Sequence, residues 1–253
     1  MEIIVIANGK GGVGKSITAI NLAHNAAEVY GLRTVLVDND PQADASKFFE
    51  ARTDGAIGMP DVLTGQAQLV QAVKATAYPL LKLVPTNRTA ELINQELLKT
   101  AGPETLYIMR DALGQIAADF DLCIIDNPTI MTITATAAIV AATRIIVPVL
   151  IDGFSVYNTG EQLEQIENIR AVNPNVKPYV LPTAYQASDE TSRSGLEYIK
   201  RSVSCPVLEP IRYSPKAREH TFARVPIRDY SRHSPMATGY KRLAEIVAGW
   251  CSN

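Results

Sequence analysis

The chain has 253 residues, of which 47% are hydrophobic and 20% charged, and its formal net charge is -2. This is the composition of an ordinary globular protein, and it argues against disordered, fibrous and disulfide-rich classes. The three cysteines, Cys123, Cys205 and Cys251, form no CxxC pair, so a disulfide framework or zinc site is not indicated and a cytoplasmic location is expected.

Short apolar runs alternate with helical patterns along the chain. We predict strands at 2–7, 34–38, 80–85, 121–126, 144–149, 177–182 and 206–211, and helices at 15–30, 89–99, 104–118, 155–172, 189–203 and 235–251. Several runs are nearly continuous in apolar residues, which is typical of parallel strands buried on both faces. The sequence therefore predicts an α/β fold: a single domain, residues 1–253, with a doubly wound, mostly parallel sheet and helices on both faces. Residues 50–78 are expected to pack as short helices on one edge.

A glycine-rich stretch, NGKGGVGKSITAINLA (residues 8–23), joins the first predicted strand to the first helix. Gly9, Gly14, Lys15 and Ser16 match GxxxxGK followed by Ser or Thr, in the strand–loop–helix context that this motif requires. Glycines let backbone N–H groups turn toward phosphates, and the helix N-terminus adds partial positive charge. Lys15 is expected to reach the β- and γ-phosphates, and the Ser16 hydroxyl to ligate Mg²⁺. The expected nucleotide-binding residues of the loop are Gly9, Lys10, Gly11, Gly12, Val13, Gly14, Lys15, Ser16 and Ile17.

Carboxylates follow two further strands. VLVDNDPQADAS (35–46) places Asp38, Asp40 and Asp44 at a strand's carboxyl end, where ligands bind in open α/β sheets. DLCIIDNPTI (121–130) is an apolar strand that ends in Asp126, the form of a strand whose Asp meets the Mg²⁺ shell. Carboxylates there can orient water or hold Mg²⁺-bound water. Cys123, inside this strand, is expected to be a core residue.

These motifs resemble the ParA/MinD superfamily of P-loop ATPases, and the resemblance extends from residue 2 to about residue 248. KGGVGKSITAINLA is similar to its deviant Walker A motif, and DNDPQADAS to its A′ motif, DxDPQxxxS. The resemblance implies ATP or ADP and Mg²⁺ as ligands, and two ATP molecules held between two subunits. It gives Lys10 a catalytic role on the other subunit's nucleotide, beside Lys15, and makes Asp40 the residue that positions the attacking water. Asp38 and Asp44 would support the Mg²⁺ shell or the switch loop.

Two positions depart from the family pattern. Ile17 stands where a hydroxyl residue usually touches the α-phosphate, so we expect a weaker grip on phosphate without loss of binding. Thr129 replaces the second proline of the usual D-x-P-P sequence, and we expect a more mobile switch loop.

The C-terminal third is basic. Residues 193–242 carry 11 Lys or Arg against 4 Asp or Glu, which is consistent with either a solvated surface or an anionic partner. By the resemblance, Pro210, Ile211 and Arg212 are candidates for the adenine pocket. The same region in relatives binds DNA without sequence preference, and the candidate DNA-binding residues here are Arg193, Lys200, Arg201, Lys216, Arg218, Arg224 and Arg228.

The leading functional hypothesis is a plasmid or chromosome partitioning ATPase. ATP would drive homodimerisation and non-specific DNA binding on the nucleoid, and a ParB-like centromere-binding partner would stimulate slow hydrolysis. A MinD-like membrane-associated division regulator is the alternative. It would need a basic amphipathic C-terminal helix, whereas Leu243, Ile246, Val247 and Trp250 are expected to pack on the sheet, so no stable membrane association is expected. An iron–sulfur ATPase is disfavoured because no cysteine suits a shared cluster.

Overall fold

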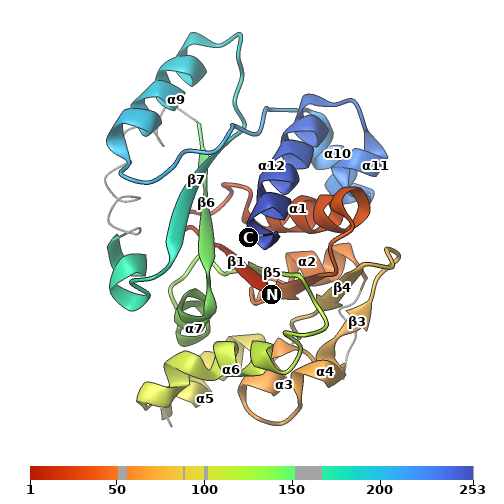
Figure 1. Ribbon diagram of the computed structural model, residues 1–253, viewed down its shortest axis with the longest axis vertical. Helices are drawn as coiled ribbons and strands as arrows, with labels where there is room; N and C mark the ends of the chain where they lie inside the picture. Colours follow the sequence, from red (N-terminus) through yellow and green to blue (C-terminus); the bar gives the residue numbers. More distant parts are fainter. Residues whose placement is uncertain (51–55, 88, 100–101, 152–166, 253) are drawn as a thin grey trace.

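A computed structural model describes residues 1–50, 56–87, 89–99, 102–151 and 167–252. Seven strands form one sheet in the order β3-β4-β2-β5-β1-β6-β7 (Figure 1). The strands are β1 (Glu2–Ile6), β2 (Thr34–Asp38), β3 (Lys74–Ala75), β4 (Leu81–Val84), β5 (Leu122–Asp126), β6 (Arg144–Leu150) and β7 (Lys177–Thr183). All neighbours pair in parallel except β3, which is antiparallel to β4 at one edge. The fold class predicted from the sequence is confirmed.

Helices cover both faces of the sheet (Figure 1). On one face lie α1 (Lys15–Tyr30), α2 (Asp44–Phe48), α10 (Lys216–Phe222), α11 (Ile227–Tyr230) and α12 (Pro235–Cys251). On the other lie α3 (Met59–Leu63), α4 (Leu69–Ala72), α5 (Ala90–Lys99), α6 (Ile108–Gly114), α7 (Ile133–Ala141) and α9 (Glu190–Ser202). A 3-10 helix, η1 (Pro103–Tyr107), precedes α6.

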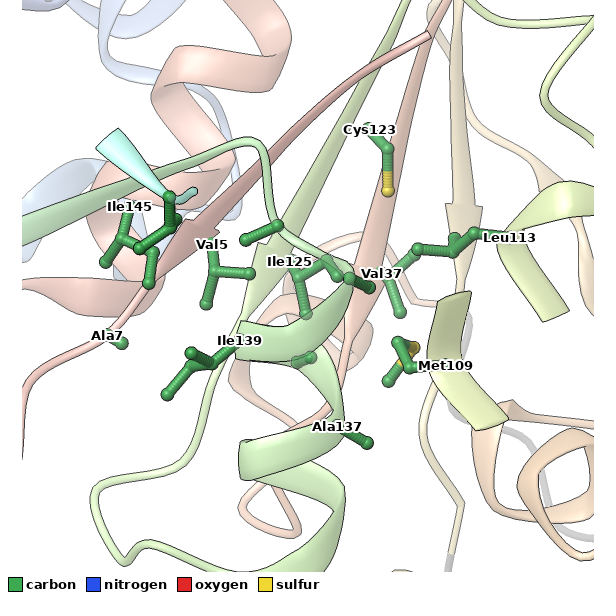
Figure 2. Close-up of a cluster of buried hydrophobic side chains, with 14 of the residues drawn as sticks. Val5, Ala7, Val37, Met109, Leu113, Cys123, Ile125, Ala137, Ile139 and Ile145 are labelled. Carbon is green, nitrogen blue, oxygen red and sulfur yellow. The ribbon is translucent and has the colours of Figure 1, made fainter. Parts of the chain in front are cut away.

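The strands feed two separate cores because successive side chains of a strand point to opposite faces. Val5, Val37 and Ile125 face the α6–α7 side, where they meet Met109, Leu113 and Ile139 (Figure 2). The alternate residues, including Ile4, Ile6, Leu36 and Ile124, face α1 and α12. Both faces are therefore buried, which explains the continuous apolar runs. Cys123 is fully buried in the first core, as expected, and burial raises the pKa of its thiol.

The C-terminal tail also packs as expected. Leu243 and Val247 are 3% and 0% exposed in the core beneath α1, and the Trp250 ring stacks on Tyr179 with centroids 4.6 Å apart. Ile246, which was expected to pack with them, is instead 37% exposed. Across the described ranges, no helix is long and apolar enough to span a membrane.

Several elements differ from the prediction. Residues 206–211 are not a strand; they touch β7 through the isolated bridge Val180–Val207, because Pro206 and Pro210 cannot donate to a ladder. The helix predicted at 104–118 is η1 followed by the shorter α6. The helices α2, α7, α10 and α11 were not predicted. Of the helix predicted at 155–172, residues 167–172 are helical, and the part before 167 lies outside the described residues.

Candidate nucleotide-binding site

The glycine-rich loop occupies the turn between β1 and α1 with its backbone open to solvent. Gly12 and Gly14 have φ of 75° and 94°, a left-handed conformation that residues with a Cβ rarely adopt. No side chain caps α1 at Gly14 and its first turn holds no acidic residue, within the part of the chain described. The first N–H groups of the helix are therefore available to an anion, and the helix dipole favours one there.

Neighbouring strands hold the loop in place. The Asn8 side chain donates from Nδ2 to the Pro148 carbonyl of β6 at 2.7 Å, and its Oδ1 accepts the Lys10 N–H at 2.7 Å. The Thr183 hydroxyl at the end of β7 donates to the Val13 carbonyl at 3.0 Å. These contacts fix both halves of the loop at the carboxyl end of the sheet, so little ordering is required when a ligand arrives.

Lys15 is almost buried, at 7% exposure. Its Nζ donates to the Thr129 hydroxyl at 2.9 Å and to the Lys10 carbonyl at 3.3 Å. Burial is the largest influence and lowers the pKa of Lys15, while the charges of Asp126 and Asp40 act in the opposite direction. A poorly hydrated ammonium among carboxylates is well suited to bind phosphate oxygens.

Asp38 and Asp126 are direct partners in the register of β2 and β5, and both are fully buried. Burial raises the pKa of Asp38 to about 6, although hydrogen bonds from Ser46 oppose the shift. Burial and the neighbouring Asp38 also raise the pKa of Asp126 well above its usual value. Neither Asp126 oxygen has a hydrogen-bond partner among the described residues. The Ser16 hydroxyl is near enough to favour the charged form of Asp126, but its geometry is not that of a hydrogen bond to the carboxylate.

An orphaned buried carboxylate beside Ser16 fits the second shell of a cation, because a positive charge would compensate it. No group of three ligating side chains occurs in the described ranges. In nucleotide sites Mg²⁺ is commonly held by one hydroxyl, phosphate oxygens and waters. Ser16 would therefore ligate the ion, and Asp126 would bind its waters. Asp38, in contrast, already accepts hydrogen bonds from Ser46 and Asp40.

The loop after β2 is organised around that carboxylate. Asp38 accepts the Ser46 N–H at 2.7 Å and the Ser46 hydroxyl at 2.6 Å on Oδ2, and the Asp40 N–H at 3.2 Å on Oδ1. The half-buried Asp40 side chain accepts the Gln42 N–H at 2.9 Å and remains at the sheet edge, near Lys15. Asp44 is exposed, pairs with Lys47 at 3.9 Å, and lines a cavity with Ser16 and Ile17.

A second cavity, of about 200 Å³, opens beside the loop. It is lined by Gly12, Gly14, Ile17, Thr183, Ile211, Arg212, Tyr213 and Tyr240, among others. Ile211 and Arg212 thus lie where the predicted adenine pocket would be. Pro210 instead lines a separate cavity of about 290 Å³ with His233 and Arg242, while Arg212 borders both.

The candidate DNA-binding residues fall into two groups. Arg193, Lys200 and Arg201 lie on α9; the others lie on or next to α10 and α11, and Figure 1 shows α12 between the two groups. Four of the seven pair with an acid in this conformation: Lys200–Glu197 at 3.0 Å, Lys216–Glu219 at 2.7 Å, Arg224–Glu50 at 2.9 Å and Arg228–Asp229 at 3.7 Å. The seven thus belong to two separate groups of helices.

Several residues at the site were not singled out from the sequence. Asn39 donates to the Asn127 side chain at 2.8 Å and so links the ends of β2 and β5. Asn8 and Thr183 hold the loop. Thr129, noted in the sequence only as a departure from D-x-P-P, holds Lys15. A signal existed only for Asn8, since Asn before a glycine favours a turn. The other partners are more than 80 residues apart.

A glycine loop between a central strand and a helix, with buried carboxylates at the ends of two adjacent strands, defines a P-loop nucleotide-binding protein. A family model described as an AAA domain matches residues 1–178. The chromosome partitioning protein ParA of Caulobacter vibrioides is 34% identical over 181 residues, which are 70% of this chain and 67% of that protein. The chain therefore belongs to this family, among the ParA-type P-loop ATPases, and the resemblance seen in the sequence is confirmed.

Solved structures share the fold. Cobyrinic acid a,c-diamide synthase from Mycobacterium smegmatis, with a bound ATP analogue and magnesium, has a TM-score of 0.85 and 26% identity. That match covers 99% of this chain and 95% of the other. A plasmid partition protein from Borrelia burgdorferi has a TM-score of 0.77 at 19% identity, covering 97% of each chain, and so has the same fold.

Proposed function

We propose that this chain is an ATP-dependent DNA-partitioning ATPase. One observation carries the proposal: Lys15, Asp40 and the unpartnered carboxylate of Asp126 meet at one edge of the sheet. That set binds a nucleotide with Mg²⁺, and it includes a carboxylate that can position water. The ATP analogue and magnesium bound to the Mycobacterium smegmatis protein, and the ParA names of relatives, support it.

Each residue has a role in this mechanism. The loop N–H groups from Gly11 to Ser16 bind the phosphates, and Lys15 neutralises charge on the β- and γ-phosphates. Ser16 and Asp126 would hold Mg²⁺, which would neutralise part of the phosphate charge. Asp126 accepts hydrogen bonds from the waters around the ion, and Asp40 holds the attacking water and accepts its proton. The adenine and ribose occupy the cavity beside Ile211 and Arg212.

Lys10 makes the ATP-bound homodimer the active unit. It lies at the outer turn of the loop and is half-buried, while Lys15 is the inner lysine. From a second subunit, Lys10 reaches the γ-phosphate and stabilises the charge that develops during transfer. The dimer brings the basic residues of α9 and α10 from two chains onto DNA, and a ParB-like partner stimulates hydrolysis and release.

DNA retention on a surface, measured with ATP, a non-hydrolysable analogue and ADP, tests the proposal. We expect retention with ATP and the analogue only, falling steeply as salt rises. Lys10→Ala should bind nucleotide normally, yet fail to dimerise or retain DNA with the analogue. Equal and negligible DNA retention with all three nucleotides would contradict DNA binding. A Lys10→Ala chain that dimerises normally would contradict the role of Lys10 on the other subunit's nucleotide.

The membrane-associated alternative is less well supported. Its amphipathic tail would have to leave the core, yet Leu243 and Val247 are buried there. Co-sedimentation with anionic liposomes in the presence of ATP discriminates the two functions: binding to lipid but not to DNA would favour the MinD-like reading.

A further inference from the structure

The contact between Lys15 and Thr129 joins the glycine-rich loop to the segment that follows β5. The Lys15 ammonium is buried, so it requires hydrogen-bond acceptors in place of water. The Thr129 hydroxyl accepts from it at 2.9 Å and the Lys10 carbonyl at 3.3 Å. Thr129 thus provides the shorter of these two contacts, across 114 positions of sequence.

Residue 129 is also one of the positions where this chain departs from its family's pattern. The sequence is Asp126-Asn127-Pro128-Thr129, whereas the family continues with a second proline. Proline has no side-chain acceptor, so the threonine adds a contact that the usual sequence cannot make. Ile130 and Met131, which follow it, are 74% and 57% exposed and do not anchor the segment in the core.

We propose that Thr129 is a latch for the P-loop lysine: its hydroxyl holds the Lys15 ammonium in the nucleotide-free chain and loses it to phosphate when nucleotide binds. The inference rests on the proposed nucleotide binding. Phosphate oxygens are charged acceptors, and hydrogen bonds between charged groups are stronger than those to a neutral hydroxyl. The contact therefore stabilises only the nucleotide-free state.

Two consequences follow from that difference. A contact made in one state alone shifts the equilibrium toward that state, so Thr129 weakens nucleotide binding. Release of the hydroxyl also frees the segment 129–131, whose exposed apolar residues lie beside the site. One hydrogen bond thereby couples nucleotide binding to the conformation of a surface segment.

Calorimetric titration of ADP with Mg²⁺ tests the latch. Thr129→Val keeps the shape of the side chain and removes the hydroxyl, and we expect roughly tenfold tighter binding, the size of one hydrogen bond to a charged group. Thr129→Pro, which restores the family sequence, should also bind more tightly, while Thr129→Ser should match the wild type. Thr136→Val is the matched control: its hydroxyl bonds to the Thr132 carbonyl at the start of α7, so its ADP affinity should stay within about twofold of wild type.

Amide hydrogen exchange of residues 129–134 provides a second readout. In the wild type, ADP should speed exchange there, and in Thr129→Val exchange should be fast with and without ADP. Unchanged or weaker ADP binding by both Thr129→Val and Thr129→Pro would overturn the latch, as would wild-type exchange that ADP does not alter. A wild-type chain that binds neither ATP nor ADP would instead overturn the proposed function, and the latch with it.

Discussion

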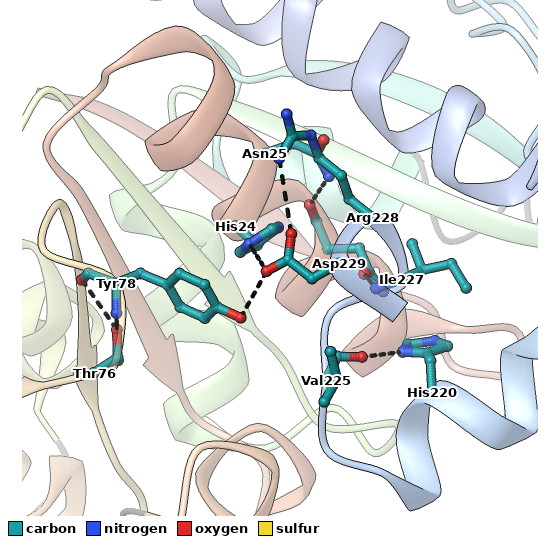
Figure 3. A network of polar contacts seen from close by, with 10 residues as sticks. His24, Asn25, Thr76, Tyr78, His220, Val225, Ile227, Arg228 and Asp229 are labelled. Carbon is teal, nitrogen blue, oxygen red and sulfur yellow. Dashed lines mark hydrogen bonds and ion pairs between the residues drawn. The ribbon is translucent and has the colours of Figure 1, made fainter. Parts of the chain in front are cut away.

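His24 joins three segments around the P-loop helix. It is fully buried in α1, with Nε2 3.1 Å from the Asp229 carboxylate of α11 and its ring edge-on to Tyr78, centroids 4.5 Å apart (Figure 3). The Tyr78 hydroxyl donates to the same carboxylate at 3.0 Å. Burial is the largest influence and lowers the pKa of His24; Asp229 opposes the shift and Arg228 adds to it. The folded protein therefore favours the neutral ring.

The sign of the pH effect follows from that direction. Because the folded pKa of His24 lies below its unfolded value of 6.5, its contribution is present above pH 6.5 and is lost as the pH falls through the folded pKa. The loss is up to about 1.4 kcal/mol per pH unit. Burial shifts the pKa of His220 in the same direction. Asp38 acts oppositely: with a pKa of about 6, the stability it contributes is lost as the pH rises through that value.

A variant separates these effects. His24→Gln removes one titrating group, so the wild-type advantage in free energy of unfolding should be constant above pH 7 and shrink by up to about 1.4 kcal/mol per pH unit below 6.5. Urea unfolding at pH 7.5, 6.5 and 5.5 measures it. A His24→Gln difference that stays constant down to pH 5.5 would refute the buried neutral histidine.

Three further predictions concern the site. Asp40→Ala should slow ATP hydrolysis by about 10²–10⁴-fold, as expected for loss of a general base, with ADP affinity within a few-fold; unaltered turnover would exclude that role. Ile17→Thr, which restores a hydroxyl at a residue bordering both cavities beside the loop, should tighten ADP binding by about fivefold in calorimetry. An unchanged constant would mean that the α-phosphate lies elsewhere. Glu50→Gln should leave thermal stability unchanged, since the pair of Glu50 with Arg224 is exposed, but should raise DNA retention. DNA retention equal to that of the wild type would mean that Arg224 does not contact DNA.

The parts of this protein that the sequence predicted well are local. The glycine loop, the acid at the end of β5 and the acids after β2 each lie within one strand–loop unit, so residue type and spacing determine their position. Parallel pairing then brings the ends of β1, β2 and β5 together, and the register of β2 and β5 places Asp38 beside Asp126. That explains why fold class and family were confirmed.

The missed parts have no local signal. The sequence of α7, ITATAAIVA, is apolar on all sides because the helix is buried against the sheet and α6, so it lacks the periodicity of an amphipathic helix. The helices α10 and α11 have only seven and four residues. The partner of Lys15 depends on how two segments 114 positions apart approach each other, and spacing carries no information about that.

The short helix α2 connects the nucleotide edge to the basic residues. At its start Ser46 is held by Asp38, and at its end the Phe48 ring meets His220 of α10 with centroids 6.2 Å apart. Glu50 and Arg224, two residues beyond the ends of α2 and α10, both have φ of 54° and pair with each other. Such backbone costs about 1 kcal/mol for a non-glycine residue, so the surrounding packing must hold both residues there. In the proposed function, a movement of Asp38 or Asp40 on phosphate binding would be passed through α2 to the Phe48–His220 contact and to the Glu50–Arg224 pair, and so to the candidate DNA-binding residues of α10.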